Sequence, residues 1–561
     1  MRLPSFVGQG VVFFLAGVGC ARVGSGGGSP PTPPAKDGAA NGVPVDASPA
    51  VDRPPPVDAS GVDACAMAIA AGSTQGCDFY ALTPPPRGSA TDGSCFVAML
   101  ANTWTAPVAI QVAYGGQALD VARIARVPIT SGMGLSYAPL PGGQLAPGQM
   151  ALLFLANGPV DPSSPLADMH VDCPVPAGVT VDPAVHGTGF GKPFRITTSA
   201  PVAAYDIYPY GGASSHISSA TLLIPTSAWG TNYIATAGFK EDPGLHNQHS
   251  VNIVAIHDGT EVTINPTAPI VGAAGVPGGP RGQPRTYNLA SGQMLQLLQP
   301  QPLSGSAISA NKVVGVWGGS DCMNIPVGWS ACDSAHQQLV PVNLLGFEYT
   351  GVSYRDRLAG KPETIPWTLI GAVDGTTLRY DPAPPRGAPG VLNRGETVEL
   401  DATVPFNVRS QDAQHPFYLA GHMTGWLKIS SDPGPGDPET VNTVPPQQWR
   451  TSYTFLTDAT YSNSHLVFTR QKMNGTFHDV TLDCLGTLGN WTPVGQDATY
   501  EYTRVDLVSD FKPQGSCRNG TNTARSNAPF GLTVWGWDFA ASYAYPAGMG
   551  VKPINDVIIV P

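Results

Sequence analysis

Hydrophobic and polar residues alternate over short runs along most of the chain, and turn-forming residues separate these runs. The stretches "VNIVAIHDGTEVTI" (251–264) and "WTLIGAVDGTTLRY" (367–380) each hold two such runs around an Asp-Gly pair. In this setting Asp-Gly predicts a β-hairpin, because the turn needs positive φ. In "HLVFTRQKMNGTFHDVTL" (465–482) an Asn-Gly pair takes the same place. Strong helical periodicity is scarce, so the pattern predicts an all-β protein.

A longer pattern occurs three times. The stretches "LIPTSAWGTNY" (223–233), "LVPVNLLGFEY" (339–349) and "TVPPQQWRTSY" (443–453) each place a large apolar residue and then a tyrosine at the same spacing after a proline. Trp229 and Trp449 occupy matching positions, so we expect both in the core. With a divergent earlier stretch, "CFVAMLANTWTAPVAIQV", the sequence predicts four tandem β-repeat units of roughly 100 to 140 residues, each with about eight short strands.

The expected units cover residues 65–214, 215–332, 333–431 and 432–550, and a closing strand at 551–561 follows them. This last stretch contains "DVIIVP", which resembles the proline-ended strand that the first unit lacks. If the C-terminal strand completes the first unit, the four units close into a propeller-like ring of roughly eight blades without open sheet edges. The alternative is a row of tandem β-sandwich modules with an ordinary terminal strand.

The N-terminus is typical of an export signal. An apolar run, "VVFFLAGVGC", follows Arg2 and ends in small residues at Cys20, so residues 1–20 resemble a bacterial lipoprotein signal that is cleaved and acylated at Cys20. Ordinary secretion is the alternative, and the run is shorter than the roughly 20 residues of a spanning helix. Residues 21–64 are rich in Pro, Gly, Ser and Ala and predict a disordered tether, because they offer little apolar surface to bury.

Composition narrows the class of partner. The chain has 561 residues, a net charge of −11 and only 12% charged residues, with no basic patch that could neutralise phosphates. Nucleic acid is therefore not an expected partner. We expect contact with a membrane only through a lipid anchor, which would place the protein at the bacterial outer membrane or cell surface. Simple secretion is the alternative location.

The cysteines support export. There are nine, and setting Cys20 aside for the lipid leaves an even number. Sequence does not fix their connectivity, but neighbouring positions suggest the pairs Cys65–Cys77, Cys95–Cys173, Cys322–Cys332 and Cys484–Cys517. No cysteine spacing fits a zinc site, and "HNQH" (246–249) lies in a loop marked by Pro and Gly, where surface histidines are expected. We therefore expect no metal and no cofactor, with calcium not excluded.

One run resembles a known family. "LSGSAISANKVVGVWGGSDCMNIPVGWSACDSAHQQLVPVNLLGFEY" (303–349), together with the Asp-Gly-Thr turns, is similar to the N-terminal domain of the IgGFc-binding protein family, in a bacterial secreted or lipoprotein-type form. The resemblance covers about residues 75–561 and implies a disulfide between Cys322 and Cys332. Leu345, where the family tends to have Trp, and the insertion at 270–285 depart from it. The resemblance implies no established enzymatic activity.

Candidate site residues are few. No nucleophile elbow or metalloprotease helix is present, so we expect no catalytic residues and no enzyme. Trp329 and Trp367 are expected in loops and are the candidates for ligand contact, because Trp is enriched in binding hot spots. A hydrolase would instead need two carboxylates some 5–10 Å apart, which Asp206, Asp321 or Asp333 could supply.

These features favour an extracellular, surface-anchored binding or adhesion protein. A tethered β scaffold would present loops to a glycan, a matrix component or a cell-surface protein. An extracellular polymer hydrolase and a structural envelope component are the alternatives. Sequence does not identify the ligand.

Overall fold

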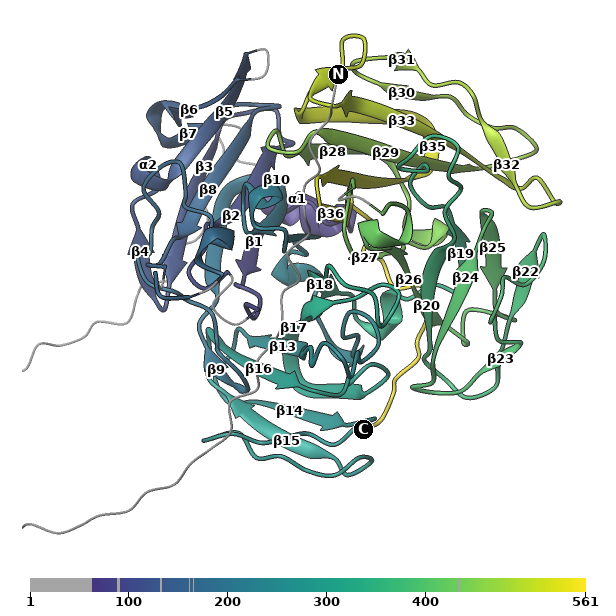
Figure 1. The fold of residues 1–561 in the computed structure, drawn as a ribbon, viewed down its shortest axis with the longest axis horizontal. Helices are drawn as coiled ribbons and strands as arrows, with labels where there is room; N and C mark the ends of the chain where they lie inside the picture. The colour runs from purple at the N-terminus through teal and green to yellow at the C-terminus, as the bar shows by residue number, and fades with distance from the viewer. Residues whose placement is uncertain (1–62, 88–90, 132–133, 161, 165, 432–433) are drawn as a thin grey trace, which may run out of the picture. The chain divides into compact units, whose positions relative to one another are not determined.

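The computed structural model describes residues 63–561, except 88–90, 132–133, 161, 165 and 432–433. All of these residues belong to one compact unit, Pro55–Pro561. The protein is mostly β, as expected, and its strands form six sheets with antiparallel pairing (Figure 1). The expected signal, Cys20 and the expected tether up to residue 62 lie outside the described residues. In the described part, no helix is both long and apolar enough to cross a membrane.

The strands fall into four groups, here called units 1 to 4. Unit 1 is a ten-stranded sheet with the central order β4-β3-β10-β2-β8-β5-β6. It also contains the helices α1 (Ala64–Ala71) and α2 (Val121–Ile124). Its strands are β1 (Gly76–Ala81), β2 (Phe96–Asn102), β3 (Val108–Tyr114), β4 (Gln117–Leu119), β5 (Ala125–Ser131), β6 (Gly134–Pro139), β7 (Gln144–Leu145), β8 (Met150–Ala156), β10 (Phe194–Tyr208) and β11 (Ser219–Leu222).

Unit 2 is an eight-stranded sheet with the central order β15-β14-β17-β13-β16-β9. Strand β9 precedes β10 in the chain, so a crossing segment of unit 1 contributes an edge strand to unit 2. The strands are β9 (Gly189–Gly191), β12 (Gly230–Ile234), β13 (His249–Ala255), β14 (Thr260–Asn265), β15 (Arg285–Leu289), β16 (Gln293–Gln299), β17 (Ala307–Met323) and β18 (Asp333–Leu339).

Unit 3 divides its strands among three small sheets, and unit 4 is a nine-stranded sheet. Unit 3 contains β19 (Glu348–Gly351), β20 (Ile365–Gly371), β21 (Thr376–Thr377), β22 (Arg379–Asp381), β23 (Val391–Leu392), β24 (Thr397–Ala402), β25 (Phe406–Arg409), β26 (Phe417–Met423) and β27 (Glu439–Asn442). Unit 4 contains β28 (Arg450–Thr457), β29 (Asn463–Gln471), β30 (Val480–Leu482), β31 (Gly486–Thr487), β32 (Thr492–Val494), β33 (Tyr500–Ser509), β34 (Lys512–Pro513), β35 (Gly520–Asp538) and β36 (Ala541–Pro546).

The unit boundaries lie later in the chain than the expected ones. Strands β11, β18 and β27 each follow an expected boundary, yet each pairs with the last long strand of the preceding unit. The repeated proline motif therefore lies just after the final strand of a unit. The chain then turns through a short 3₁₀ segment at Thr226–Ala228, Val342–Leu344 or Pro446–Gln448 and begins the next unit.

The repeated tyrosines have the same structural role in three units. Each phenolic oxygen accepts a hydrogen bond from the N–H three residues earlier and donates one to a carbonyl of its own unit. The acceptors are the carbonyls of Val314, Phe417 and Phe530, for Tyr233, Tyr349 and Tyr453 respectively. Trp229 and Trp449 are buried, as expected, and their indole N–H groups donate to Ile224 O and Val444 O. The sequence repeat is therefore also a structural repeat.

The expected hairpins are correct as turns but wrong as strand pairs. Gly259, Gly375 and Gly475 have φ values of +63°, +69° and +81°, as the turns require. However, β13 and β14 pair with successive parts of β17 instead of with each other, and β29 and β30 do the same on β35. Strands β17 and β35 have 17 and 19 residues. A strand of this length can pair with two shorter ones in turn, which a local turn signal does not reveal.

Each unit buries an apolar face, and units 1 and 4 share a core. In unit 2, Val251 and Ile253 of β13 pair with Leu297 and Leu295 of β16 and belong with them to one apolar cluster. The largest cluster joins residues of β2, β8 and β10 in unit 1 with residues of β28, β29 and β35 in unit 4. The first and last units are thus packed against each other, although they are far apart in the sequence.

The last strands of the four units meet one another. Strand β11 contacts β18 and β36, and β27 also contacts β18 and β36, so these central strands form a closed cycle of neighbours. Hydrogen bonds join them. The Gln337 side-chain amide donates to Ala220 O and Ala544 O, and the Asn442 amide donates to Gln338 O.

The expected closing strand at 551–561 is not a strand of unit 1. Residues 72–74 instead pair with residues 549–551, just before it, through a bridge between Ser73 and Gly550 and flanking backbone hydrogen bonds. The segment 551–561 has no strand and runs between units 2 and 3. There the Asn232 side chain bonds both backbone groups of Ile559, and the Ile559 side chain fills an apolar cluster with Ile234 and Leu345. Val557 and Ile559 thus pack between units 2 and 3, whereas Val551 packs in a cluster with Tyr80 and Leu82.

Four disulfide bonds lie within the units: Cys65–Cys77, Cys95–Cys173, Cys322–Cys332 and Cys484–Cys517. These are the pairs suggested by neighbouring sequence positions. Units 1, 2 and 4 carry them, whereas unit 3 has none among its described residues. Four disulfides indicate an extracellular or otherwise oxidising location.

Candidate functional site

Each central strand is preceded by a loop, and the four loops lie together. We call them the loop face; it comprises residues 209–218, 324–332, 424–438 without 432–433, and 539–540. The contacts again form a cycle: Ile217 packs against Cys322 and Cys332, Gly425 N–H donates to Ile325 O, Ala540 N–H donates to Gly434 O, and the rings of Phe539 and His216 lie 5.6 Å apart. One surface is thus built from corresponding loops of all four units.

The loop face carries exposed aromatic side chains. Trp329 is 42% exposed and Phe539 is 50% exposed. The ammonium of Lys428, on a neighbouring loop, lies 5.2 Å from the centre of the Trp329 ring. Large rings held at a surface can stack on a ligand with little loss of conformational entropy. Trp329 was expected to contact a ligand, whereas Phe539 was not. The sequence feature that could have identified Phe539 is a large aromatic residue in a tight turn, where packing does not require one.

The Trp329 loop is rigidly held. The Cys322–Cys332 disulfide closes it. Inside the loop, the buried Asp242 carboxylate accepts hydrogen bonds from the Asn324 side chain and the Gly328 N–H, both at 2.8 Å. Partial burial opposes ionisation of Asp242, but these and further backbone hydrogen bonds hold its pKa below the usual value. The position of Trp329 is therefore set by a covalent and a polar contact.

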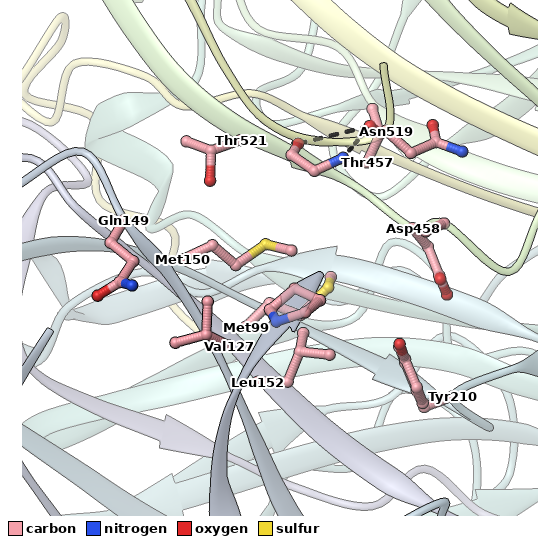
Figure 2. Close-up of a pocket in the computed structure, with 13 residues that line it drawn as sticks. Met99, Val127, Gln149, Met150, Leu152, Tyr210, Thr457, Asp458, Asn519 and Thr521 are labelled. Carbon is pink, nitrogen blue, oxygen red and sulfur yellow. Dashed lines mark hydrogen bonds between the residues drawn. The ribbon is translucent and has the colours of Figure 1, made fainter. Parts of the chain in front are cut away.

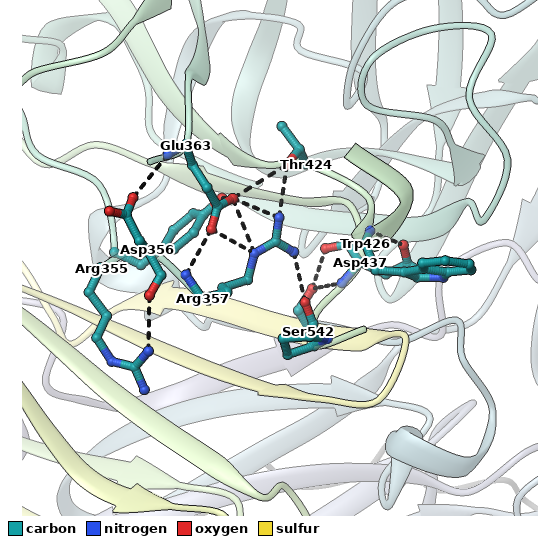
Figure 3. Close-up of polar contacts among 10 residues, drawn as sticks. Arg355, Asp356, Arg357, Glu363, Thr424, Trp426, Asp437 and Ser542 are labelled. Carbon is teal, nitrogen blue, oxygen red and sulfur yellow. Dashed lines mark hydrogen bonds and ion pairs between the residues drawn. The ribbon is translucent and has the colours of Figure 1, made fainter. Parts of the chain in front are cut away.

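The corresponding loop of unit 3 is held by a buried ion pair instead (Figure 3). Arg357 and Glu363 have almost no solvent exposure, and Arg357 Nη2 lies 2.7 Å from Glu363 Oε2. The guanidinium also donates to Thr424 Oγ1 at 2.8 Å and to Pro435 O at 3.1 Å. These two acceptors lie near the start and the end of the loop, so one arginine side chain ties both ends together.

Buried acidic residues lie at the ends of the loops and in the central strands that follow them. Burial raises the pKa of Asp333, Asp437 and Glu439 well above the usual range, and the first is raised further by the other two. Glu439 Oε1 accepts hydrogen bonds from Ser219 and from Thr440 N–H. The carboxyl group of Glu439 thereby links β27 to β11, which is a structural role.

The carboxylates considered for hydrolysis are not accessible to a polymer. Asp206 in β10 and Asp333 in β18 are fully buried, and burial raises the pKa of both. Asp321 is buried as well; Arg87 Nη1 lies 3.2 Å from its Oδ2, and the Gln248 N–H donates to its Oδ1. A polymeric substrate therefore has no route to these groups without a large rearrangement.

The expectation that Trp367 lies in a loop is wrong, and its burial does not favour contact with a ligand. It belongs to β20 and is only 4% exposed. Its ring packs edge-on against Phe406 at 5.4 Å and closely against Gly421. Ile365, Trp367 and Leu369 share one face of the strand and belong to one apolar cluster. This period-2 pattern, read over the whole run, is the signal for a core position.

Of the buried histidines, three have a strongly lowered pKa. Burial lowers the pKa of His249 to about 4 and that of His336 and His422 to about 3. His249 was expected on the surface but lies in β13, with Nδ1 2.8 Å from Ala237 O. His422 is hydrogen bonded to Thr368 and Thr440. All three are therefore neutral core residues at neutral pH.

A cavity of about 230 Å³ lies between units 1 and 4 (Figure 2). Its floor is apolar, with Met99, Met150 and Leu152, and the Tyr210 and Asp458 side chains point toward one another at one end. Burial raises the pKa of Asp458 to about 6. No histidine or second carboxylate lines the cavity, so it lacks the partner that general acid–base catalysis by this group would need.

These features define a class of protein: a repeated antiparallel β scaffold that presents a surface of rigid loops, which is typical of binding proteins. A family comparison gives the identity. The family model described as IgGFc binding protein matches residues 219–536, more than half of the chain. The chain therefore belongs to the IgGFc-binding protein family, as the resemblance implied. Among curated proteins, no sequence matches it.

Proposed function

We propose that this protein is an extracellular, surface-anchored adhesion protein that binds its ligand with the loop face. The main supporting observation is that four corresponding loops converge and expose Trp329 and Phe539. A disulfide and a buried arginine fix two of these loops. The family description makes the Fc part of IgG the first ligand to test. Glycans and matrix or cell-surface proteins are the other ligands in this proposal, since exposed aromatic rings suit both stacking on sugars and protein contacts.

The anchor is part of the proposal. Cys20, preceded by an apolar run, would carry the lipid of a bacterial lipoprotein, and residues 21–64 would form the tether. The disulfides support export, because such bonds persist in oxidising compartments. A lipid on Cys20 would bring the loop face to the cell surface without a spanning helix.

We also propose that units 1 to 4 act as one ring-like scaffold and not as independent modules. The cycle of contacts among β11, β18, β27 and β36, the core shared by units 1 and 4, and the pairing of residues 72–74 with 549–551 support this arrangement. Such a scaffold leaves fewer open sheet edges than a row of modules. It would also keep the four loops in fixed positions.

The proposal includes no enzymatic activity. The burial of Asp206, Asp321 and Asp333 weighs against the hydrolase alternative, because a polymer could not reach these carboxylates. A purely structural envelope role is the remaining alternative. It predicts that the exposed rings of the loop face have no ligand.

Binding of the full chain to immobilised Fc, mucin glycans and matrix proteins tests the proposal. We expect Trp329→Ala and Phe539→Ala to weaken binding by about tenfold or more each, because buried aromatic contacts dominate interfaces. Phe190→Ala is the matched control: this ring is 38% exposed but lies on the edge strand β9, outside the loop face. Unchanged binding in both loop-face variants would contradict the proposal. So would the absence of wild-type binding to every ligand tested.

A further inference from the structure

We propose that Asp92, Asp182 and His186 form a binding site for one divalent metal ion of the zinc class. One ligand atom from each residue lies within 4.8 Å of the others. In the described part of the chain, no other three His, Cys, Asp or Glu side chains converge in this way. The site lies in unit 1, between the turn before β2 and the segment that crosses to β9.

Two close backbone approaches and a disulfide build this site. Gly158 N–H donates to Gly93 O at 2.7 Å, and a Cβ atom on Gly158 would lie only 2.6 Å from Asp182 N. A glycine at position 158 therefore lets the turn carrying Asp92 and the segment carrying Asp182 come together. The Cys95–Cys173 disulfide joins the same two regions covalently. The ligand residues are thus held in place without a metal ion.

One ligand atom points independently to a cation. Asp92 Oδ1 is shielded from solvent and accepts no hydrogen bond, although buried carboxylate oxygens are normally paired. The neighbouring histidine does not supply the missing partner, because the Nδ1 atom of His170 lies 3.0 Å from the backbone oxygen of Asp92 instead. Among the described residues, no lysine or arginine forms an ion pair with Asp92 or Asp182. A metal ion would satisfy this oxygen and balance the two negative charges.

The donor set selects the class of metal. Two carboxylate oxygens and one imidazole nitrogen suit zinc or manganese, whereas calcium prefers oxygen ligands alone. Asp182 Oδ2 and His186 Nε2 lie 2.8 Å apart, and the His186 side chain is about half exposed. A metal ion would replace this hydrogen bond and keep a position open toward solvent. His170, which contacts Asp92 O and Asp172, would support the site from behind.

A metal ion bound at this site would connect two segments of the scaffold. Asp92 lies close to Cys95, whose carbonyl accepts a hydrogen bond from Tyr210 N–H in the loop face. Asp182 and His186 precede β9, the strand that unit 1 contributes to unit 2. A bound ion would therefore connect the base of one loop to the crossing segment between two units.

Zinc titration of the full chain after EDTA treatment and dialysis tests this inference, with isothermal titration calorimetry and elemental analysis as readouts. We expect about one tightly retained zinc ion per chain, and a loss of affinity of about 100-fold in Asp92→Asn and in His186→Gln. His186 is half exposed, so the second variant retains the fold even if the first does not. Circular dichroism confirms folding.

The matched control is Asp412→Asn. Asp412 and His415 form a surface pair with a 2.7 Å contact, but no second carboxylate joins them. This variant should retain zinc as the wild type does. Absence of retained zinc in the wild type, or equal affinity in Asp92→Asn, would overturn the proposal. Neither result depends on whether the loop face binds a ligand, because the titration contains zinc alone.

Discussion

The loop before β18 and the loop before β27 occupy corresponding places in units 2 and 3, yet they are held by different chemistry. A disulfide between Cys322 and Cys332 closes the first. The buried guanidinium of Arg357 bridges Thr424 and Pro435 in the second, with Glu363 neutralising its charge. Both devices join the two ends of a loop. The covalent one works by limiting the unfolded chain, whereas the ionic one depends on every buried partner being present.

This difference teaches that the loop face needs fixed loop ends but not a particular bond. A disulfide can be lost with a moderate cost, since its two sulfur atoms leave no charge behind. Removing one partner of a buried ion pair leaves the other charge without compensation in a medium of low polarity. We therefore expect unit 3, which has no disulfide among its described residues, to be the more sensitive of the two regions to a single substitution.

The largest effect is expected for Glu363→Gln. This change leaves Arg357 charged, buried and without its carboxylate, which should lower the free energy of unfolding by about 3–5 kcal/mol. Chemical denaturation measures this loss. Glu399→Gln is the control, because the Glu399 ion pair with Lys240 has a similar contact of 3.0 Å but is partly open to solvent, with Lys240 49% and Glu399 22% exposed, and should cost under about 1 kcal/mol. Equal costs for the two variants would contradict the comparison.

The double change Cys322→Ser and Cys332→Ser should come next. The disulfide closes a loop with a sequence separation of 10, for which loop-closure entropy gives about 2.5–3 kcal/mol. Denaturation under non-reducing conditions measures it. The matched pair Cys65→Ser and Cys77→Ser, with a separation of 12, should cost about the same but leave the Trp329 loop in place. Only the first double variant should weaken ligand binding by the loop face.

Acid should affect both regions alike, because each has a neutral buried histidine next to its loop. Burial lowers the pKa of His336 to about 3, from the ordinary histidine value of 6.5. When the pH falls below about 6.5, the unfolded chain therefore binds a proton at this side chain, whereas the folded protein does not. Stability is therefore fully present above about pH 6.5 and is lost as the pH falls, by about 2 kcal/mol per histidine at pH 5.

His336→Gln should remove this contribution. The difference in unfolding free energy between about pH 7.5 and pH 5 should shrink by about 2 kcal/mol relative to the wild type. His422→Gln should give a similar reduction, since burial lowers the pKa of His422 to about 3 as well. Denaturant titrations at the two pH values measure both. An unchanged pH dependence in either variant would show that the imidazole is accessible to protons in the folded state.

The smallest effect on stability is expected for Trp329→Ala. The ring is 42% exposed and packs on no apolar cluster, so the free energy of unfolding should change by no more than about 0.5 kcal/mol. A thermal melt measures this. A loss of binding with an unchanged melt would assign the ring to recognition, whereas a large loss of stability would assign it to the structure of the loop.

The sequence allowed much of the local structure to be predicted. The period-2 runs, the turns at Gly259, Gly375 and Gly475, and the repeated proline motif all correspond to features of the fold. The partners of the strands were not predictable in the same way. Pairing of β13 and β14 with β17 depends on the length and curvature of a strand some 50 residues away, and a turn residue carries no information about that distance.

The candidate site was harder to predict for the same reason. Trp329 was identified because it is a tryptophan in an expected loop, and Trp is enriched in binding hot spots. Phe539 gains its role from a neighbour in another unit, His216, and the Arg357–Glu363 pair gains its role from loop residues some 60 to 80 positions further along the chain. Trp367 was misplaced because a large aromatic residue outside the repeat was read as exposed. The C-terminal segment was assigned to unit 1 by likeness, whereas its side chains pack between units 2 and 3.

The Cys65–Cys77 disulfide has a mechanical consequence. The residues that pair with 549–551, at positions 72–74, lie inside the loop that this disulfide closes. A pull on the chain ahead of Cys65 would therefore pass through the sulfur atoms directly to β1, which is hydrogen bonded along β10. The contact between the first and last units carries no load on this path. A pull on the N-terminal side of the chain would thus load a sheet and leave the contact between residues 72–74 and 549–551 unloaded.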